Sequence, residues 1–186
     1  MDTLRHIAEN GYAAVVVSNQ PLAKADRDKV LGLCADYIER PNFGYDFGAY
    51  RDGVLSIHER LASLKRLVLI NDSAWYPLPG KRNWIQEAEE MGHDLVGAVS
   101  HYGTPRADPE HFMDIDWRYS STHKNFHYAS FALSFGPRLL RDAQFYRFWR
   151  KLRMDNDKKN GLCDAAKLRL RNGSCTMATH TGARLI

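Results

Sequence analysis

The sequence predicts an α/β fold in which helices cover both faces of a mostly parallel sheet, as a three-layer sandwich. Two observations predict it. Apolar runs of strand length that contain β-branched residues, such as residues 12–18 and 67–70, are typical of strands buried on both faces. Segments with helical periodicity alternate with these runs, as in strand–helix–strand units. The predicted order begins on a helix, so we expect a further strand of the sheet to precede it.

The first part of the chain supplies two helices and two strands. Residues 2–10 have apolar side chains at helical spacing and end at an Asn-Gly pair, a common helix stop. Residues 12–18 form a continuous apolar run that predicts a buried strand. A second helix over residues 25–35 and a short strand over residues 37–40 follow.

The middle of the chain carries the clearest helix. Its apolar residues recur at helical spacing from 46 to 64, and Asp46 is a suitable N-cap. Residues 65–70 predict the next buried strand, residues 84–91 a helix, and residues 94–100 a third buried strand.

The last part of the chain contains one strand, one helix and two segments without pattern. Residues 101–124 are a long polar connection, of a length that is uncommon unless functional. Residues 126–135 alternate in polarity, which predicts a half-exposed strand. Pro137, in the first helical position, opens a helix over residues 138–153. We therefore expect one domain over residues 1–153 and a basic, poorly determined tail over residues 154–186.

Composition narrows the class of protein. The chain has a net charge of +4, and residues 155–186, with six Lys/Arg and three Asp/Glu, supply +3 of it. The rest of the chain is therefore close to neutral. For this reason we do not expect a nucleic-acid partner. Peripheral association with an anionic membrane stays open. No run reaches the roughly 20 apolar residues that span a bilayer, and no signal peptide is recognisable, so we expect a cytoplasmic protein, with the inner face of the membrane as an option.

The first motif with possible chemistry is Asn42-x-Gly44-x-Asp46-x-Gly48, which opens the predicted helix at residue 46. It is neither a dinucleotide fingerprint nor a phosphate-binding P-loop. Its glycines let a ligand approach the backbone, and a helix N-terminus holds a phosphate or pyrophosphate well. The Asp46 carboxylate is suited to hydrogen bonds with sugar or ribose hydroxyls. The alternative is a purely structural turn.

The second motif, Asn71-Asp72-Ser73, directly follows a buried strand. One acidic group at a strand end is suited to hold Mg²⁺ or Mn²⁺ on a diphosphate, which makes Asp72 a metal candidate. The alternative is a polar end to the strand. Asp114-Ile115-Asp116, in the long connection, is a weaker metal candidate. His127, at the start of the last predicted strand, is either an active-site ligand or an ordinary polar residue.

Together, three segments of the chain resemble the rhamnan synthesis protein F family of bacterial glycosyltransferases. They are residues 42–50, residues 69–73 and residues 127–131, and the resemblance covers about residues 10–153. It implies a GT-A-like fold. It also implies transfer of a sugar, typically L-rhamnose, from a nucleotide-diphosphate donor such as dTDP-rhamnose to a glycan or lipid-linked glycan acceptor, in synthesis of a surface polysaccharide of rhamnan or O-antigen type.

The resemblance also assigns roles to residues. Asp72 would bind the metal, and His127 would face the acceptor cleft. The nucleotide-sugar site would be lined by Asn42, Gly44, Asp46, Gly48, Tyr50 and Asn71. Such proteins continue into an acidic segment that could supply the base an inverting transferase needs. This chain has its basic tail there, as a truncation or a shifted reading frame would produce, so the catalytic residue is unknown. The alternative function is therefore an inactive nucleotide-sugar-binding or partner-binding domain of the same fold.

Overall fold

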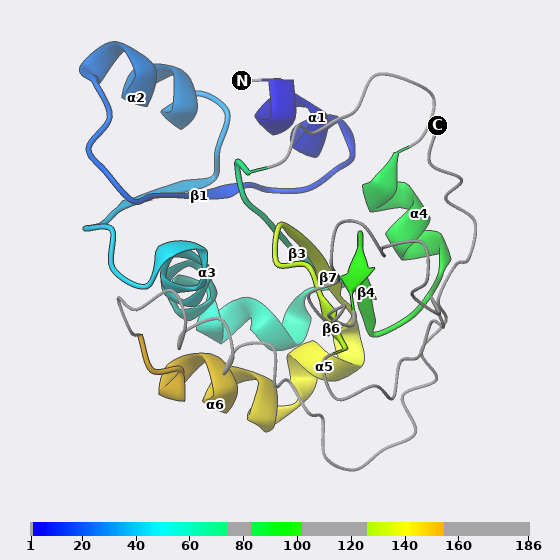
Figure 1. Cartoon of the computed structure of the whole chain (residues 1–186). Coiled ribbons are helices and arrows are strands. Elements are labelled where there is room, and N and C mark those ends of the chain that lie inside the picture. The colour runs from blue at the N-terminus through cyan, green and yellow to red at the C-terminus, as the bar shows by residue number, and fades with distance from the viewer. Residues whose placement is uncertain (1, 74–82, 102–125, 155–186) are drawn as a thin grey trace, which may run out of the picture.

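The computed structural model describes residues 2–73, 83–101 and 126–154 (Figure 1). Helices and strands alternate in these ranges, so the predicted mixed α/β composition is confirmed. The helices are α1 (Asp2–Glu9), α2 (Lys24–Leu31), α3 (Tyr45–Ser56), the 3-10 helix η1 (His58–Ser63), α4 (Trp84–Glu90), α5 (Pro137–Arg141) and α6 (Ala143–Lys151). The strands are β1 (Val15–Ser18), β2 (Asp36–Glu39), β3 (Leu67–Ile70), β4 (Leu95–Gly97), β5 (Ser100–His101), β6 (His127–Tyr128) and β7 (Ala132–Phe135).

The strands pair in small sheets, and the prediction of a mostly parallel sheet is wrong for the described strands. β1 pairs with β2 in parallel, whereas β7 lies between β3 and β4 and is antiparallel to both. β5 and β6 form a separate antiparallel pair. β3 and β4 run in the same direction, but β7 separates them. An apolar run indicates that a strand is buried, but it does not indicate the direction of the strand, because a central antiparallel strand is as buried as a parallel one.

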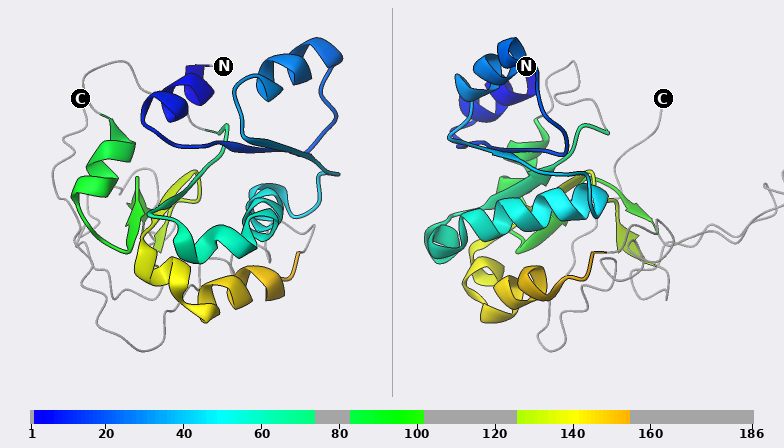
Figure 2. Two further views of the ribbon diagram at one scale, coloured as in Figure 1. Left: turned by 180° about the vertical axis from the view of Figure 1, so that it is seen from behind. Right: turned by 90° about the vertical axis from the view of Figure 1, so that its left-hand side faces the viewer.

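Helices lie on both sides of the β1–β2 pair. In both views of Figure 2, α1 and α2 lie on one side of these strands, with α3 on the other. α3 contacts β1 and, on its other side, α6. The predicted cover on two faces is therefore present around this pair.

β7 is the most deeply buried strand of the described chain. All four of its residues are buried, so the half-exposed strand predicted over residues 126–135 is wrong. The segment instead divides into β6 and β7, with a turn between them. The polar residue of β7 that caused the apparent alternation, Ser134, is fully buried and accepts a hydrogen bond of 2.9 Å from Arg66 through its hydroxyl. A small hydroxyl with a partner is tolerated in a core.

Two predicted helices are each divided in the structure. The helix expected over residues 46–64 ends at Ser56 and continues as η1, and the helix expected over residues 138–153 is interrupted at Asp142. Asp142 has extended backbone angles and caps α6, because its carboxylate accepts a hydrogen bond of 2.8 Å from the Gln144 amide. Pro137 opens α5, as predicted. In the ranges that the structure describes, no helix has the length and apolarity to cross a membrane.

Candidate functional site

The site begins at the N-terminus of α3. Gly44 is the N-cap residue, with φ of +76°, and Tyr45 follows with φ of +47°, which is strained for a residue with a side chain. The prediction that Asp46 is the N-cap is wrong, because the helix has already begun at Tyr45. The Asp46 carboxylate is therefore free of the capping role. It accepts a hydrogen bond of 2.7 Å from the Asn71 side-chain amide instead.

Asn71 connects this helix to the end of β3. Its backbone N–H donates to the carbonyl of Phe131 at 3.1 Å, so the pairing of β3 with the β7 segment extends one residue beyond the strand. Its side-chain oxygen accepts from the Ser73 amide at 3.1 Å, while its amide nitrogen binds Asp46. The two sequence motifs, 25 residues apart along the chain, thus form one polar cluster, with Asp72 exposed in the turn between Asn71 and Ser73.

Tyr50 lies one turn beyond Asp46 on α3, and its side chain is buried. Its hydroxyl donates a hydrogen bond of 2.9 Å to the Ser130 carbonyl in the turn between β6 and β7. Burial, and then the negative charges of Asp46 and Asp72, raise the pKa of Tyr50 well above its usual range. The Tyr50 hydroxyl therefore stays protonated at neutral pH.

Tyr50→Phe is expected to change how stability depends on pH. The pKa of Tyr50 is higher in the folded chain than in the unfolded chain, so its contribution is complete below pH about 10 and is lost as the pH rises toward the folded-state value. Near neutral pH the variant should lose about 1 kcal/mol, the usual value of one hydrogen bond. Above pH about 10 its stability should fall less steeply than that of the wild type. Urea unfolding of both proteins between pH 8 and pH 11 measures this, and equal slopes would exclude the effect.

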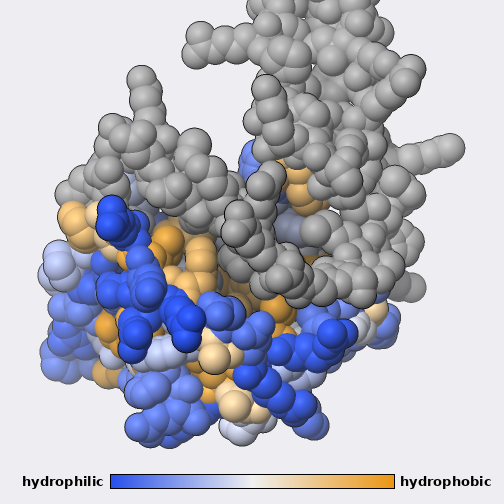
Figure 3. Space-filling view, turned by 90° about the horizontal axis from the view of Figure 1, so that it is seen from below, coloured by the Kyte–Doolittle hydropathy of each residue, from blue (hydrophilic) through white to orange (hydrophobic). Residues whose placement is uncertain are grey.

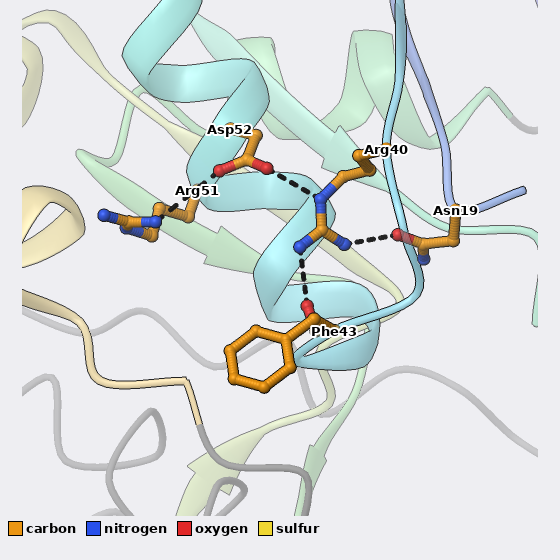
Figure 4. A network of polar contacts seen from close by, with 5 residues as sticks. All are labelled: Asn19, Arg40, Phe43, Arg51 and Asp52. Atoms are coloured by element: carbon orange, nitrogen blue, oxygen red, sulfur yellow. Dashed lines mark hydrogen bonds and ion pairs between the residues drawn. The ribbon is translucent and has the colours of Figure 1, made fainter.

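Arg40 holds the loop in front of α3 in place (Figure 4). Its side chain is only 9% exposed and ties together three segments of the chain. Its guanidinium donates to the Asp52 carboxylate on α3 at 2.6 Å, to the Asn19 side chain after β1 at 2.5 Å, and to the Phe43 carbonyl at 2.6 Å. A rigid planar donor is suited to such a three-way contact. This role of Arg40 was not predicted, because its position at the end of a predicted strand is the only signal of it in the sequence.

The two glycines of the first motif are required by contacts within the protein. Gly48 is buried on α3, and a Cβ there would overlap the Phe43 carbonyl oxygen and lie 2.8 and 3.0 Å from the two terminal nitrogens of Arg40. Gly44 needs its positive φ, and a Cβ there would lie 2.5 Å from the sulfur of Met154. We expected a ligand to lie against the backbone at these two glycines. In the structure, the Phe43 carbonyl and the Arg40 side chain lie against Gly48, and the Met154 side chain lies against Gly44.

The other two predicted site residues of the described chain are Asn42 and His127. Asn42 is exposed in the loop that Arg40 holds. His127 is half-buried on β6, in register with His101 of β5, and is three residues before Ser130, the partner of Tyr50. The structure thus joins Asp46 and Asn71 by a direct hydrogen bond, with Tyr50 one turn further along α3 and Asp72 next to Asn71 in the chain. Asp114 and Asp116 lie outside the described residues.

The donor set of the cluster fits a hard divalent cation that is shared with a ligand. Within the described ranges there is no group of three or more His, Cys, Asp or Glu side chains that would enclose a metal by itself. Asp46 and Asp72 supply carboxylate oxygens, of which one Asp46 oxygen already binds Asn71. Mg²⁺ is commonly held by one or two carboxylates together with substrate phosphates and water. The arrangement therefore suits a cation bound between these carboxylates and a diphosphate.

Comparisons with known proteins show which family the chain is similar to. The family model described as rhamnan synthesis protein F matches residues 14–164, which include every candidate residue. The uncharacterized protein y4gN of Sinorhizobium fredii is 36% identical over 157 residues, which cover 84% of this chain and 37% of that protein. Virulence protein VirA of Vibrio anguillarum is 34% identical over 91 residues, 48% of this chain and 29% of that protein. The chain thus spans little more than a third of the first relative's length. No solved structure matches the chain.

Proposed function

This chain belongs to the rhamnan synthesis protein F family, and from that premise we propose that it carries the donor site of a GT-A-like glycosyltransferase of surface polysaccharide synthesis. The donor is a nucleotide-diphosphate sugar, dTDP-rhamnose, and the acceptor is a glycan or lipid-linked glycan. The reaction takes place in the cytoplasm, at the inner face of the membrane. The observation that carries the proposal is the hydrogen bond between Asn71 and Asp46, since it unites the two family motifs at one place.

The position of the cluster supports a nucleotide-diphosphate ligand. It combines the N-terminus of α3, where backbone N–H groups and the helix dipole favour an anion, with polar side chains just beyond the end of β3. Ligands of α/β proteins commonly bind beyond the carboxyl ends of strands. Phe43 and Tyr45, on either side of Gly44, are 43% and 38% exposed, so both rings are accessible to a base or a sugar.

The charges of the cluster make a cation part of the proposal. Asp46 and Asp72 would repel a diphosphate by themselves, so Mg²⁺ or Mn²⁺ must lie between the carboxylates and the phosphates. Asp72 is the better ligand because it is exposed, whereas Asp46 is half-buried and bound to Asn71. When bound, the cation would neutralise the charge on the departing diphosphate.

The transfer itself needs an acceptor hydroxyl, a base and a leaving group. The hydroxyl oxygen attacks the anomeric carbon, the bond from that carbon to the phosphate oxygen breaks, and dTDP leaves with the electron pair while a base takes the hydroxyl proton. His127 lies on the acceptor side of this arrangement in our proposal. The protonated Tyr50 is not suited to be the base, since its hydroxyl is bound to Ser130.

Release of dTDP from dTDP-rhamnose tests the proposed reaction. With an acceptor glycan present, the wild-type protein should release dTDP in the presence of Mg²⁺ or Mn²⁺ and lose this activity when EDTA removes the cation. Asp72→Asn keeps the size of the side chain but removes its charge, so it should lower the rate at least about tenfold. Asp26→Asn removes an exposed charge from α2, far from the cluster along the chain, and should leave the rate unchanged.

The alternative function is an inactive nucleotide-sugar-binding or partner-binding domain. It would be established by binding of dTDP with Mg²⁺ but no release of dTDP under any of these conditions. Equal rates of dTDP release for the wild type and Asp72→Asn would instead show that Asp72 is not part of the site.

A further inference from the structure

Residues 137–153, which contain α5 and α6, carry a concentrated positive charge. They contain six Lys/Arg and one Asp, a net charge of +5. Residues 1–136 contain 14 Lys/Arg and 18 Asp/Glu, a net charge of −4. Residues 155–186 have six Lys/Arg and three Asp/Glu, so they add a further positive charge of +3. The moderate overall charge of the chain therefore hides a strong separation of charge along it.

Three cations share the outer face of α6. Phe145 and Trp149 are buried on its inner side, where α6 packs against α3. Arg147, Arg150 and Lys151 are spaced at i, i+3 and i+4, so their side chains lie together on the opposite side of the helix. All three are exposed. We refer to these three residues as the basic face.

The basic face has no described counter-charge. No carboxylate in residues 2–73, 83–101 or 126–154 forms an ion pair with its three side chains. The acidic residue of the two helices, Asp142, caps α6 through the Gln144 amide. α5 and α6 lie at the bottom of Figure 1, so Figure 3 looks onto this side of the molecule, where hydrophilic side chains cover much of the described surface.

We propose that the basic face binds the anionic surface of a lipid bilayer. Clusters of Lys and Arg on one side of a helix are attracted to anionic headgroups, and each cation raises the partition coefficient of the protein onto the bilayer about fivefold. Single-stranded nucleic acid is a poorer fit, because such binding uses aromatic rings on which bases stack. The ring that Arg150 contacts, Tyr146, has its centroid 5.8 Å from the Arg150 guanidinium carbon and 5.6 Å from the centroid of the His58 ring, which stacks on it.

The contact with the bilayer is electrostatic, without insertion. Trp149 is fully buried and Phe145 is 3% exposed, so these two side chains cannot enter the lipid. Phe148 is half-buried and packs against the core. Binding should therefore weaken steeply with salt, because the screening length falls from about 10 Å at 0.1 M to about 3 Å at 1 M ionic strength. This inference does not depend on the donor site, and failure of nucleotide binding would leave it unaffected.

Sedimentation with lipid vesicles tests the proposal on the whole chain. The wild type should sediment with vesicles that contain phosphatidylglycerol, but not with phosphatidylcholine alone, and 1 M salt should release it. The combined variant Arg147→Gln, Arg150→Gln and Lys151→Gln should lower the partition coefficient by about a hundredfold. Circular dichroism should show an unchanged fold, since all three side chains are exposed.

A control variant removes the same charge from another part of the surface. Arg5→Gln, Lys24→Gln and Lys29→Gln change exposed residues of α1 and α2, at the top of Figure 1, and should retain vesicle binding within a few fold. The proposal is overturned if the wild type ignores anionic vesicles, if both triple variants lose binding equally, or if the basic-face variant binds like the wild type. It is also overturned if an RNA or DNA oligonucleotide, at equal phosphate concentration, displaces the wild type from vesicles.

Discussion

Gly48→Ala is expected to destabilise the protein by about 3 kcal/mol and to displace the loop in front of α3. The backbone of Gly48 is helical, so alanine itself would fit the local conformation. The added Cβ, however, would overlap the Phe43 carbonyl, which is backbone held by Arg40 and has no flexible end to move aside. The loop must therefore shift away from α3 and break the contact between Arg40 and Phe43. Thermal or urea unfolding measures the loss.

Gly53→Ala provides the comparison on the same helix. A Cβ at Gly53 would meet only a methyl group of Val17, at 3.3 Å, and alanine favours a helix over glycine by up to about 1 kcal/mol. Gly53→Ala should therefore be neutral or slightly stabilising. If Gly48→Ala is tolerated as well as Gly53→Ala, the loop does not lie against α3 as described.

Much of the fold could be predicted from periodicity, because periodicity records which side chains are buried. The apolar stripe expected on residues 46–64 is present, with Tyr50, Val54 and Leu61 buried. The pattern could not show that the helix changes type near Ile57, since η1 continues the same buried side. Nor could it show strand direction, which depends on how distant segments meet and made β7 an antiparallel central strand.

The site was predictable in its residues but not in its contacts. Asp46 and Asn71 were both selected from the sequence, yet Asp46 was expected to cap α3, because a sequence cannot show that Gly44 begins the helix in a left-handed conformation. Two features of the site depend on tertiary packing. They are the hydrogen bond between Asp46 and Asn71 and the contacts that Arg40 makes with three segments of the chain. No local pattern records them.

The basic face was missed because charge was averaged over a long stretch. Residues 1–154 are close to neutral as a whole, and this balance suggested an ordinary surface. The average combines the acidic residues 1–136 with the basic residues 137–153, which occupy different elements of the structure. Charge counted by element would have identified α5 and α6.

The second large effect is expected for nucleotide binding at the polar cluster. A carboxylate that binds a cation on a diphosphate contributes a charged interaction, so removing it should weaken binding of dTDP in the presence of Mg²⁺ by about a hundredfold. Asp72→Asn tests this contribution with little risk to the fold, because Asp72 is exposed. Asp46→Ala tests the other carboxylate and also removes the partner of Asn71.

Calorimetric titration of the protein with dTDP, with and without Mg²⁺, is the most direct test that this cluster is the donor site. Mg²⁺ should tighten binding of dTDP to the wild type and to Asp26→Asn. Asp72→Asn and Asp46→Ala should bind dTDP about a hundredfold more weakly than the wild type, and Mg²⁺ should no longer improve their binding. If both variants bind dTDP as tightly as the wild type and respond equally to Mg²⁺, the donor site lies elsewhere.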